Sequence, residues 1–158
     1  HGGRDGDPEM PPERYTERFL ELNRLLSREG VGLAQENVNS YIACHPGFLR
    51  AMRQYSNDAV RFVLDVKQAV RAGHTPWEIL DAMGPCVAHL HLSDHGTAGD
   101  CLLPGEGDFA FSKLFGRLLQ SGYRGAALVE VYRSAFAQPE ELAAAWRWLQ
   151  MQYAKLPG

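Results

Sequence analysis

Four short, mostly apolar runs each lead into an acidic residue or a histidine, and this repeat limits the possible folds more than any other feature. The residues that end the runs are Glu36, Asp65, His91 and Glu130, at intervals of 29, 26 and 39 residues. A segment of helical character lies between each run and the next. Strict alternation of strands and helices predicts a parallel sheet with right-handed crossovers. Because the carboxyl ends of parallel strands lie at one edge, we expect the four side chains to meet there.

The expected elements follow from apolar periodicity and from capping residues. We expect strands over residues 31–35, 60–64, 85–92 and 126–129, with a long loop over 96–111. We expect helices over 12–29, 48–55, 76–83, 112–121 and from 139 onward, the third opened by a Thr75–Glu78 capping box and the fourth capped by Ser112. Their buried faces should include Tyr15, Phe19, Leu22 and Leu26 in the first helix and Leu142, Trp146, Leu149 and Tyr153 in the last.

The spacing also bounds the architecture. About 30 residues per strand and helix is what a (β/α)8 barrel of about 250 residues requires. A chain of 158 residues holds four such units, so we expect one domain, 1–158, that forms half of a TIM-type barrel. The missing strands would leave an open sheet edge and a half-filled interior. This predicts a homo-oligomer or pairing with the missing half of the barrel.

Composition narrows the class of protein. The content of 45% hydrophobic and 22% charged residues is typical of a soluble domain, and a net charge of −3 does not favour a nucleic-acid partner. The three cysteines form no CxxC pair, which argues against a disulfide framework or a cysteine zinc site and favours a cytoplasmic setting. No run is long enough for a membrane span, and the polar start has no signal-peptide character. Because the chain begins without methionine, we expect a fragment.

The four strand-end residues indicate a particular chemistry. Two glutamates, an aspartate and a histidine form a hard, mixed oxygen and nitrogen donor set for one divalent ion: Mn²⁺, Mg²⁺, Co²⁺ or Zn²⁺. Such an ion polarises a carbonyl, while carboxylates on either side move a proton. The alternative is that each residue is an ordinary polar strand end, satisfied by its neighbours.

Several ordered motifs resemble the second half of the xylose isomerase-like TIM barrels, which include sugar isomerases and epimerases, dehydratases and apurinic-site endonucleases. The motifs are Glu36-Asn37, Leu64-Asp65, His91-Leu92-Ser93-Asp94, Gly105-Glu106-Gly107-Asp108-Phe109 and Val129-Glu130-Val131. The resemblance covers residues 31–132 and implies that the chain is the C-terminal half of a barrel. By the same resemblance, His1-Gly2-Gly3 is similar to the end of the family's fourth strand.

The resemblance implies roles for the four residues. Glu36, Asp65, His91 and Glu130 match the ligands of one divalent metal, and the two glutamates match the acid and base on opposite faces of the substrate. The implied function is a metal-dependent sugar isomerase or epimerase that transfers a proton next to a carbonyl through an enediolate. A dehydratase of a cyclic polyol ketone and a non-catalytic half-barrel remain as alternatives.

Further residues are candidates for contact with a sugar or polyol substrate. Gln68 stands where many relatives have a histidine and can hydrogen-bond a hydroxyl, but it cannot act as an acid or base. Lys67 either binds a carbonyl or phosphate oxygen or is a solvated loop lysine, and His95 and Arg133 are further candidates. The loop over 105–109 offers carboxylates but no histidine at the matching place, which weakens the endonuclease interpretation.

Overall fold

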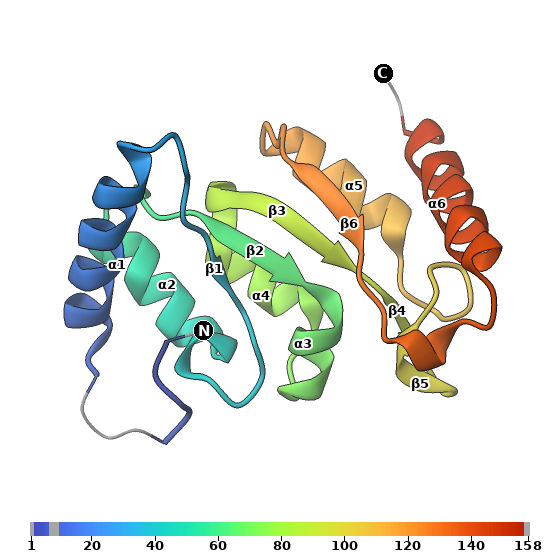
Figure 1. Cartoon of the computed structure of the whole chain (residues 1–158), viewed down its shortest axis with the longest axis horizontal. Helices are drawn as coiled ribbons and strands as arrows, with labels where there is room; N and C mark the ends of the chain where they lie inside the picture. The colour runs from blue at the N-terminus through green and yellow to red at the C-terminus, as the bar shows by residue number, and fades with distance from the viewer. Residues whose placement is uncertain (1, 7–9, 157–158) are drawn as a thin grey trace.

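The structure, a computed structural model, describes residues 2–6 and 10–156 (Figure 1). The helices are α1 (Pro12–Ser27), α2 (Pro46–Tyr55), α3 (Val66–Arg71), α4 (Pro76–Met83), α5 (Phe111–Gln120) and α6 (Pro139–Ala154). The strands are β1 (Gln35–Glu36), β2 (Phe62–Asp65), β3 (Val87–Leu92), β4 (Asp94–Gly96), β5 (Gly99–Leu102) and β6 (Ala126–Val129). Short 3-10 turns lie at Ile42–Cys44, Gly84–Cys86 and Arg133–Ala135.

Four of the strands form a parallel sheet in the order β1-β2-β3-β6. Each strand lies beside the next strand of the sheet along the chain, with at least one helix in the connection, as in a (β/α) barrel. The chain therefore has the predicted α/β fold of TIM-barrel type, as a partial barrel. Strands β4 and β5 form a separate antiparallel pair.

The hydrophobic core lies between one face of the sheet and the helices. Leu64 of β2 and Leu90 and Leu92 of β3 point into this core and are buried. The alternate positions of the same strands point to the other face, where His91 pairs in register with Asp65 and with Leu128. In a closed barrel this second face lines the interior, so the predicted ligands belong to the inner face.

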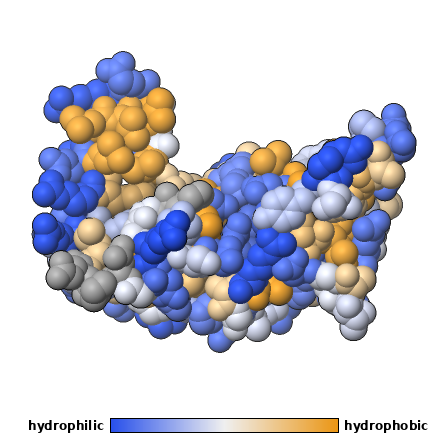
Figure 2. Space-filling model, turned by 60° about the horizontal axis from the view of Figure 1, so that its bottom comes forward, coloured by the Kyte–Doolittle hydropathy of each residue, from blue (hydrophilic) through white to orange (hydrophobic). Residues whose placement is uncertain are grey.

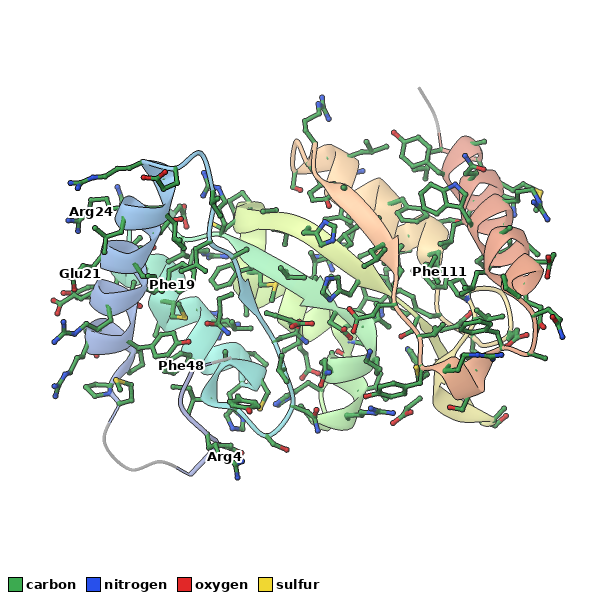
Figure 3. The ribbon with its side chains drawn as sticks, viewed as in Figure 1. Arg4, Phe19, Glu21, Arg24, Phe48 and Phe111 are labelled. Carbon is green, nitrogen blue, oxygen red and sulfur yellow. The ribbon has the colours of Figure 1, made fainter. Side chains whose placement is uncertain are left out.

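Helix α1 shows how the sequence pattern sets the packing. Phe19 is buried and points toward the rest of the fold, whereas Glu21 and Arg24 point outward (Figure 3). The predicted capping box at the start of α4 is present, because the Thr75 hydroxyl accepts from Glu78 N–H and the Glu78 carboxylate accepts from Thr75 N–H. No helix within residues 2–6 and 10–156 is long and apolar enough to cross a membrane.

Four features differ from the prediction. The first strand is only two residues long, and Val31 is exposed before it. Residues 66–71 form helix α3 directly after β2, where no helix was predicted, because Asp65 accepts from Gln68 N–H and caps it. The predicted loop over 96–111 contains most of the β4–β5 hairpin. Gly2 and Gly3 form no strand, and His1 lies outside the described residues.

The predicted cap and some predicted core positions were wrong. Helix α5 has Ala110 as its N-cap, and the Ser112 hydroxyl instead donates to Gln152 of α6. Leu22, Trp146 and Tyr153 are exposed, each by more than two fifths. The reason is their position: Leu22 lines a groove beside β1, and Trp146 and Tyr153 line another beside β6. Within residues 2–6 and 10–156, these two strands are the unpaired edges of the sheet.

Candidate metal centre

The four predicted ligands lie together at the carboxyl end of the parallel sheet. Glu36 and Asp65 are the last residues of β1 and β2, His91 lies near the end of β3, and Glu130 directly follows β6. One potential ligand atom from each residue lies within 4.8 Å of every other. The structure therefore brings together residues that are up to 94 positions apart in the sequence, as the strand-end pattern predicted.

The imidazole of His91 is at the centre of the cluster. Its Nδ1 lies 2.9 Å from Glu36 Oε1 and 2.6 Å from Glu130 Oε2, and 3.6 Å from Asp65 Oδ2. The carboxylates of Asp65 and Glu36, with Glu130, raise the pKa of His91 to about 10, against the opposite effect of burial. Without an ion, the cluster therefore holds a proton on His91 at neutral pH.

Asp65 has one satisfied and one unsatisfied carboxylate oxygen. Oδ1 accepts from Gln68 N–H, whereas Oδ2 is buried and has no hydrogen-bond partner among the described residues. The Asn37 side chain fixes the backbone of Asp65 on both sides, because Asn37 Oδ1 accepts from Asp65 N–H and Asn37 Nδ2 donates to the Asp65 carbonyl. Two cationic groups lie near Oδ2 beyond hydrogen-bond distance, His91 Nδ1 at 3.6 Å and Lys67 Nζ at 3.7 Å. A buried carboxylate oxygen that is held in place in this way can take a closer cation as a ligand.

The donor set fits a divalent ion. Three carboxylates and one imidazole supply the hard oxygen and borderline nitrogen ligands that Mg²⁺, Mn²⁺, Co²⁺ and Zn²⁺ accept. His91 and Glu36 are about one fifth exposed at the side chain, so the cluster opens to the inner face of the sheet. This exposure leaves a route by which an ion and a substrate oxygen can reach the ligands.

Lys67 reaches the same cluster from helix α3, so it is not a solvated loop lysine. Its Nζ lies 3.1 Å from Glu130 Oε1 and 3.7 Å from Asp65 Oδ2, and the side chain is only 2% exposed. Burial lowers the pKa of Lys67, but the Asp65 and Glu130 carboxylates outweigh it and the pKa is raised. The ammonium is therefore charged in the folded chain.

The other predicted substrate contacts occupy different settings. Gln68 Oε1 accepts from Asn39 N–H, which ties α3 to the loop after β1. His95 lies on β4 against Phe109, and its Nε2 is buried with no hydrogen-bond partner among the described residues. Arg133 is exposed and donates to the carbonyls of Phe136 and Ala137. His89 packs edge-on against His91, with ring centroids 5.2 Å apart.

Sequence reasoning missed the role of Asp94. Its carboxylate is fully buried and accepts from three backbone N–H groups, those of His95, Gly105 and Phe109. This single side chain holds the loop over 103–109 against β4. The available signal in the sequence was Asp94 followed by the glycine-containing motif over 105–109. A carboxylate that accepts from several backbone N–H groups needs those backbone segments to approach it closely, and glycine allows this approach.

A second group of potential ligands consists of Asp5, Cys44 and His45. The Asp5 carboxylate and His45 Nε2 are 2.8 Å apart, and both side chains are about half exposed. A hydrogen bond at the surface is therefore sufficient to explain why Asp5 and His45 lie together. Burial and the Asp5 charge raise the pKa of the Cys44 thiol, so the neutral thiol is favoured.

The parallel sheet and its edge cluster define a protein of the (β/α)-barrel class. The chain belongs to the xylose isomerase-like TIM barrel family, whose model matches residues 1–152.

Three relatives show the range of the similarity. Fructoselysine 3-epimerase of Shigella flexneri is 24% identical over 144 residues, which are 88% of this chain and 52% of that protein. D-Psicose 3-epimerase of Clostridium cellulolyticum, crystallised with D-tagatose, superimposes with a TM-score of 0.71 at 19% identity over 94% of this chain and 60% of its own. A xylose isomerase-like TIM barrel protein of Mycobacterium smegmatis, in complex with magnesium, superimposes with a TM-score of 0.71 at 21% identity. The match covers 99% of this chain and 55% of that protein. The chain thus spans about half the length of these relatives.

Proposed function

We propose that this protein provides the C-terminal half of a divalent-metal-dependent sugar isomerase or epimerase, which transfers a proton next to a carbonyl through an enediolate. One observation carries the proposal: Glu36, Asp65, His91 and Glu130 converge, so that one potential ligand atom of each lies within 4.8 Å of every other. The similarity to two sugar 3-epimerases supports the choice of reaction.

The proposed centre assigns separate tasks to the residues of the chain. Glu36 Oε1, Asp65 Oδ2, a ring nitrogen of His91 and Glu130 Oε2 would hold Mn²⁺, Mg²⁺, Co²⁺ or Zn²⁺. When bound, the ion would polarise the substrate carbonyl and lower the cost of the negative charge on its oxygen. The carboxylates of Glu36 and Glu130, from opposite ends of the sheet order, would remove and return the proton.

The surroundings of the cluster suggest how a sugar would be held. Gln68 is anchored through Oε1, which would leave its amide N–H groups to meet a hydroxyl. The Nε2 of His95, which has no hydrogen-bond partner in the part of the chain that the structure describes, is a second candidate for contact with a polyol oxygen, and the exposed Arg133 is a third. Each of these contacts is part of the proposal.

The two sheet edges support a proposal on assembly. Leu128 of β6 is about half exposed on the inner face, and apolar grooves lie beside β1 and β6. Apolar side chains gather on α1, at the left of the view in Figure 2, beside a hollow. We propose that these edges pair with the other half of a barrel or with a second copy, which would enclose the metal centre.

Metal content tests the proposal directly. We expect the purified chain to bind about one equivalent of Mn²⁺ by titration, and His91→Ala and Glu36→Gln to lose it. Glu106→Gln is the matched control, because Glu106 is an exposed acid of the loop over 103–109 and is not one of the four converging residues. The complete protein with its metal should exchange a substrate proton with solvent for at least one keto-sugar. Stoichiometric binding that survives His91→Ala, or no exchange across a keto-sugar panel, would contradict the proposal.

A further inference from the structure

Lys67 is a buried cation that contacts two of the proposed metal ligands and lies outside the ligand set. It is the second residue of α3, and this short helix begins where Asp65 caps it, so the fold directs the side chain back to the strand ends. Nζ is 3.1 Å from Glu130 Oε1 and 3.7 Å from Asp65 Oδ2. At 2% exposure, the ammonium is already desolvated and occupied by protein carboxylates.

The side chains packed around Lys67 are also held in place. Nζ lies 4.9 Å from the centre of the Tyr132 ring, and the Arg71 guanidinium lies at the same distance from that ring. Arg71 donates to the Tyr132 hydroxyl and forms a bidentate pair with Asp100. Arg71 is therefore paired with Asp100, and Lys67 shares the Asp65 and Glu130 carboxylates with His91.

The two oxygens of Glu130 have different neighbours. Oε1 accepts from the Lys67 ammonium, whereas Oε2 faces His91 Nδ1 at 2.6 Å. Lys67 thus holds Oε1 away from the centre of the cluster and presents Oε2 to it. With three carboxylates, Lys67 and one divalent ion, the centre would be neutral, and a neutral buried centre avoids the cost of an uncompensated charge.

We infer that Lys67 is a positioning residue that acts as a fixed counter-cation of the metal centre: it orients Glu130 as a ligand through Oε2 alone and weakens metal binding enough to keep the ion exchangeable. The inference rests on the proposed function, because it takes the four residues as ligands.

The size of the effect follows from the distances. Ligand oxygens lie about 2 Å from a bound ion, so the Lys67 ammonium would lie within about 6 Å of it. At the effective dielectric constant of about 20 that suits protein sites, repulsion at this distance changes a binding constant by at least about tenfold. Without Lys67, the Asp65 and Glu130 carboxylates would also repel each other in the metal-free chain, which adds to the gain on metal binding.

The test is a Mn²⁺ titration of wild-type protein, Lys67→Met and the control Lys155→Met, with thermal unfolding of each metal-free protein. Lys67→Met keeps the length of the side chain but removes its charge, and Lys155→Met removes the same charge from the exposed residue that follows α6. We expect Lys67→Met to bind Mn²⁺ at least tenfold more tightly and its metal-free form to unfold at a lower temperature. Lys155→Met should match wild type in both.

Each outcome decides between the two proposals. If wild type binds Mn²⁺ through His91 and Lys67→Met binds within twofold of it or more weakly, the inference on Lys67 is wrong while the metal centre stands. If neither protein binds Mn²⁺, the metal centre and the inference both fail. Should Lys67→Met not fold, Lys67→Gln removes the same charge with a polar side chain, and its titration decides in the same way.

Discussion

Replacing Asp94 with alanine should destabilise the fold more than any change at an exposed acid. The Asp94 carboxylate is fully buried and accepts three backbone hydrogen bonds, of 2.9 Å from His95 N–H, 2.9 Å from Gly105 N–H and 3.0 Å from Phe109 N–H. In Asp94→Ala these three donors lose their acceptor in a place that water reaches poorly.

The expected cost follows from the number of bonds. Hydrogen bonds to a charged group contribute roughly 1.5–3 kcal/mol each, and three of them set an upper limit of about 9 kcal/mol. The loop can move outward and let water reach part of the backbone, so we expect a loss of about 3–5 kcal/mol in the free energy of unfolding. For a chain of this size, that corresponds to a fall in Tm of roughly 10 °C.

Urea unfolding followed by circular dichroism measures this loss. Asp94→Asn should cost about 2 kcal/mol, because one amide oxygen remains while the amide N–H group faces the Gly105 donor. Asp108→Ala is the control on the same loop, and its exposed side chain predicts a change within about 0.5 kcal/mol. An Asp94→Ala protein within 1 kcal/mol of wild type would refute the assignment of Asp94 as the residue that holds this loop.

Two further predictions concern the same end of the sheet. A Cβ at Gly107 would clash with the His95 carbonyl oxygen and lie 2.6 Å from Asp94 Oδ1, so Gly107→Ala should lower the free energy of unfolding in urea by about 1–3 kcal/mol. The control Gly47→Ala, with open space around the new Cβ, should cost no stability. Equal stabilities of the two variants would contradict the clash. The raised pKa of His91, about 10, means that a metal ion must displace a proton below that pH, so Mn²⁺ affinity should rise by up to tenfold per pH unit from pH 7 to 9. In the metal-free chain the sign is opposite, because the stability contributed by protonated His91 is lost as the pH rises toward 10. A pH-independent affinity in the Mn²⁺ titration would show that His91 releases no proton.

Local patterns in the sequence predicted most of the architecture. Apolar runs that end in polar residues, at intervals near 30, predicted the parallel sheet, and the Thr75–Glu78 capping box predicted the start of α4. The convergence of Glu36, Asp65, His91 and Glu130 could also be predicted, because strand ends of a parallel sheet share one edge. Their role as ligands remains a prediction.

Other features depend on contacts between segments that are distant in the sequence. The burial of Lys67 requires Glu130, 63 positions away, and it could not be read from a lysine in an apparently polar connection. The exposure of Leu22 and Trp146 depends on which strands are sheet edges, which no helical periodicity encodes.

The sequence by itself therefore determined the order of strands and helices and the residue types at the strand ends, because hydrophobic periodicity and capping act within a few residues along the chain. Only the tertiary structure decided that Asp65 Oδ2 accepts no hydrogen bond within residues 2–6 and 10–156, that Lys67 faces Glu130 Oε1, and that Asp94 holds the loop over 103–109. These contacts are set by strand register and by the close approach of backbone segments that are distant in the sequence. A shift of one residue in the register of a strand would move its side chains to the opposite face of the sheet.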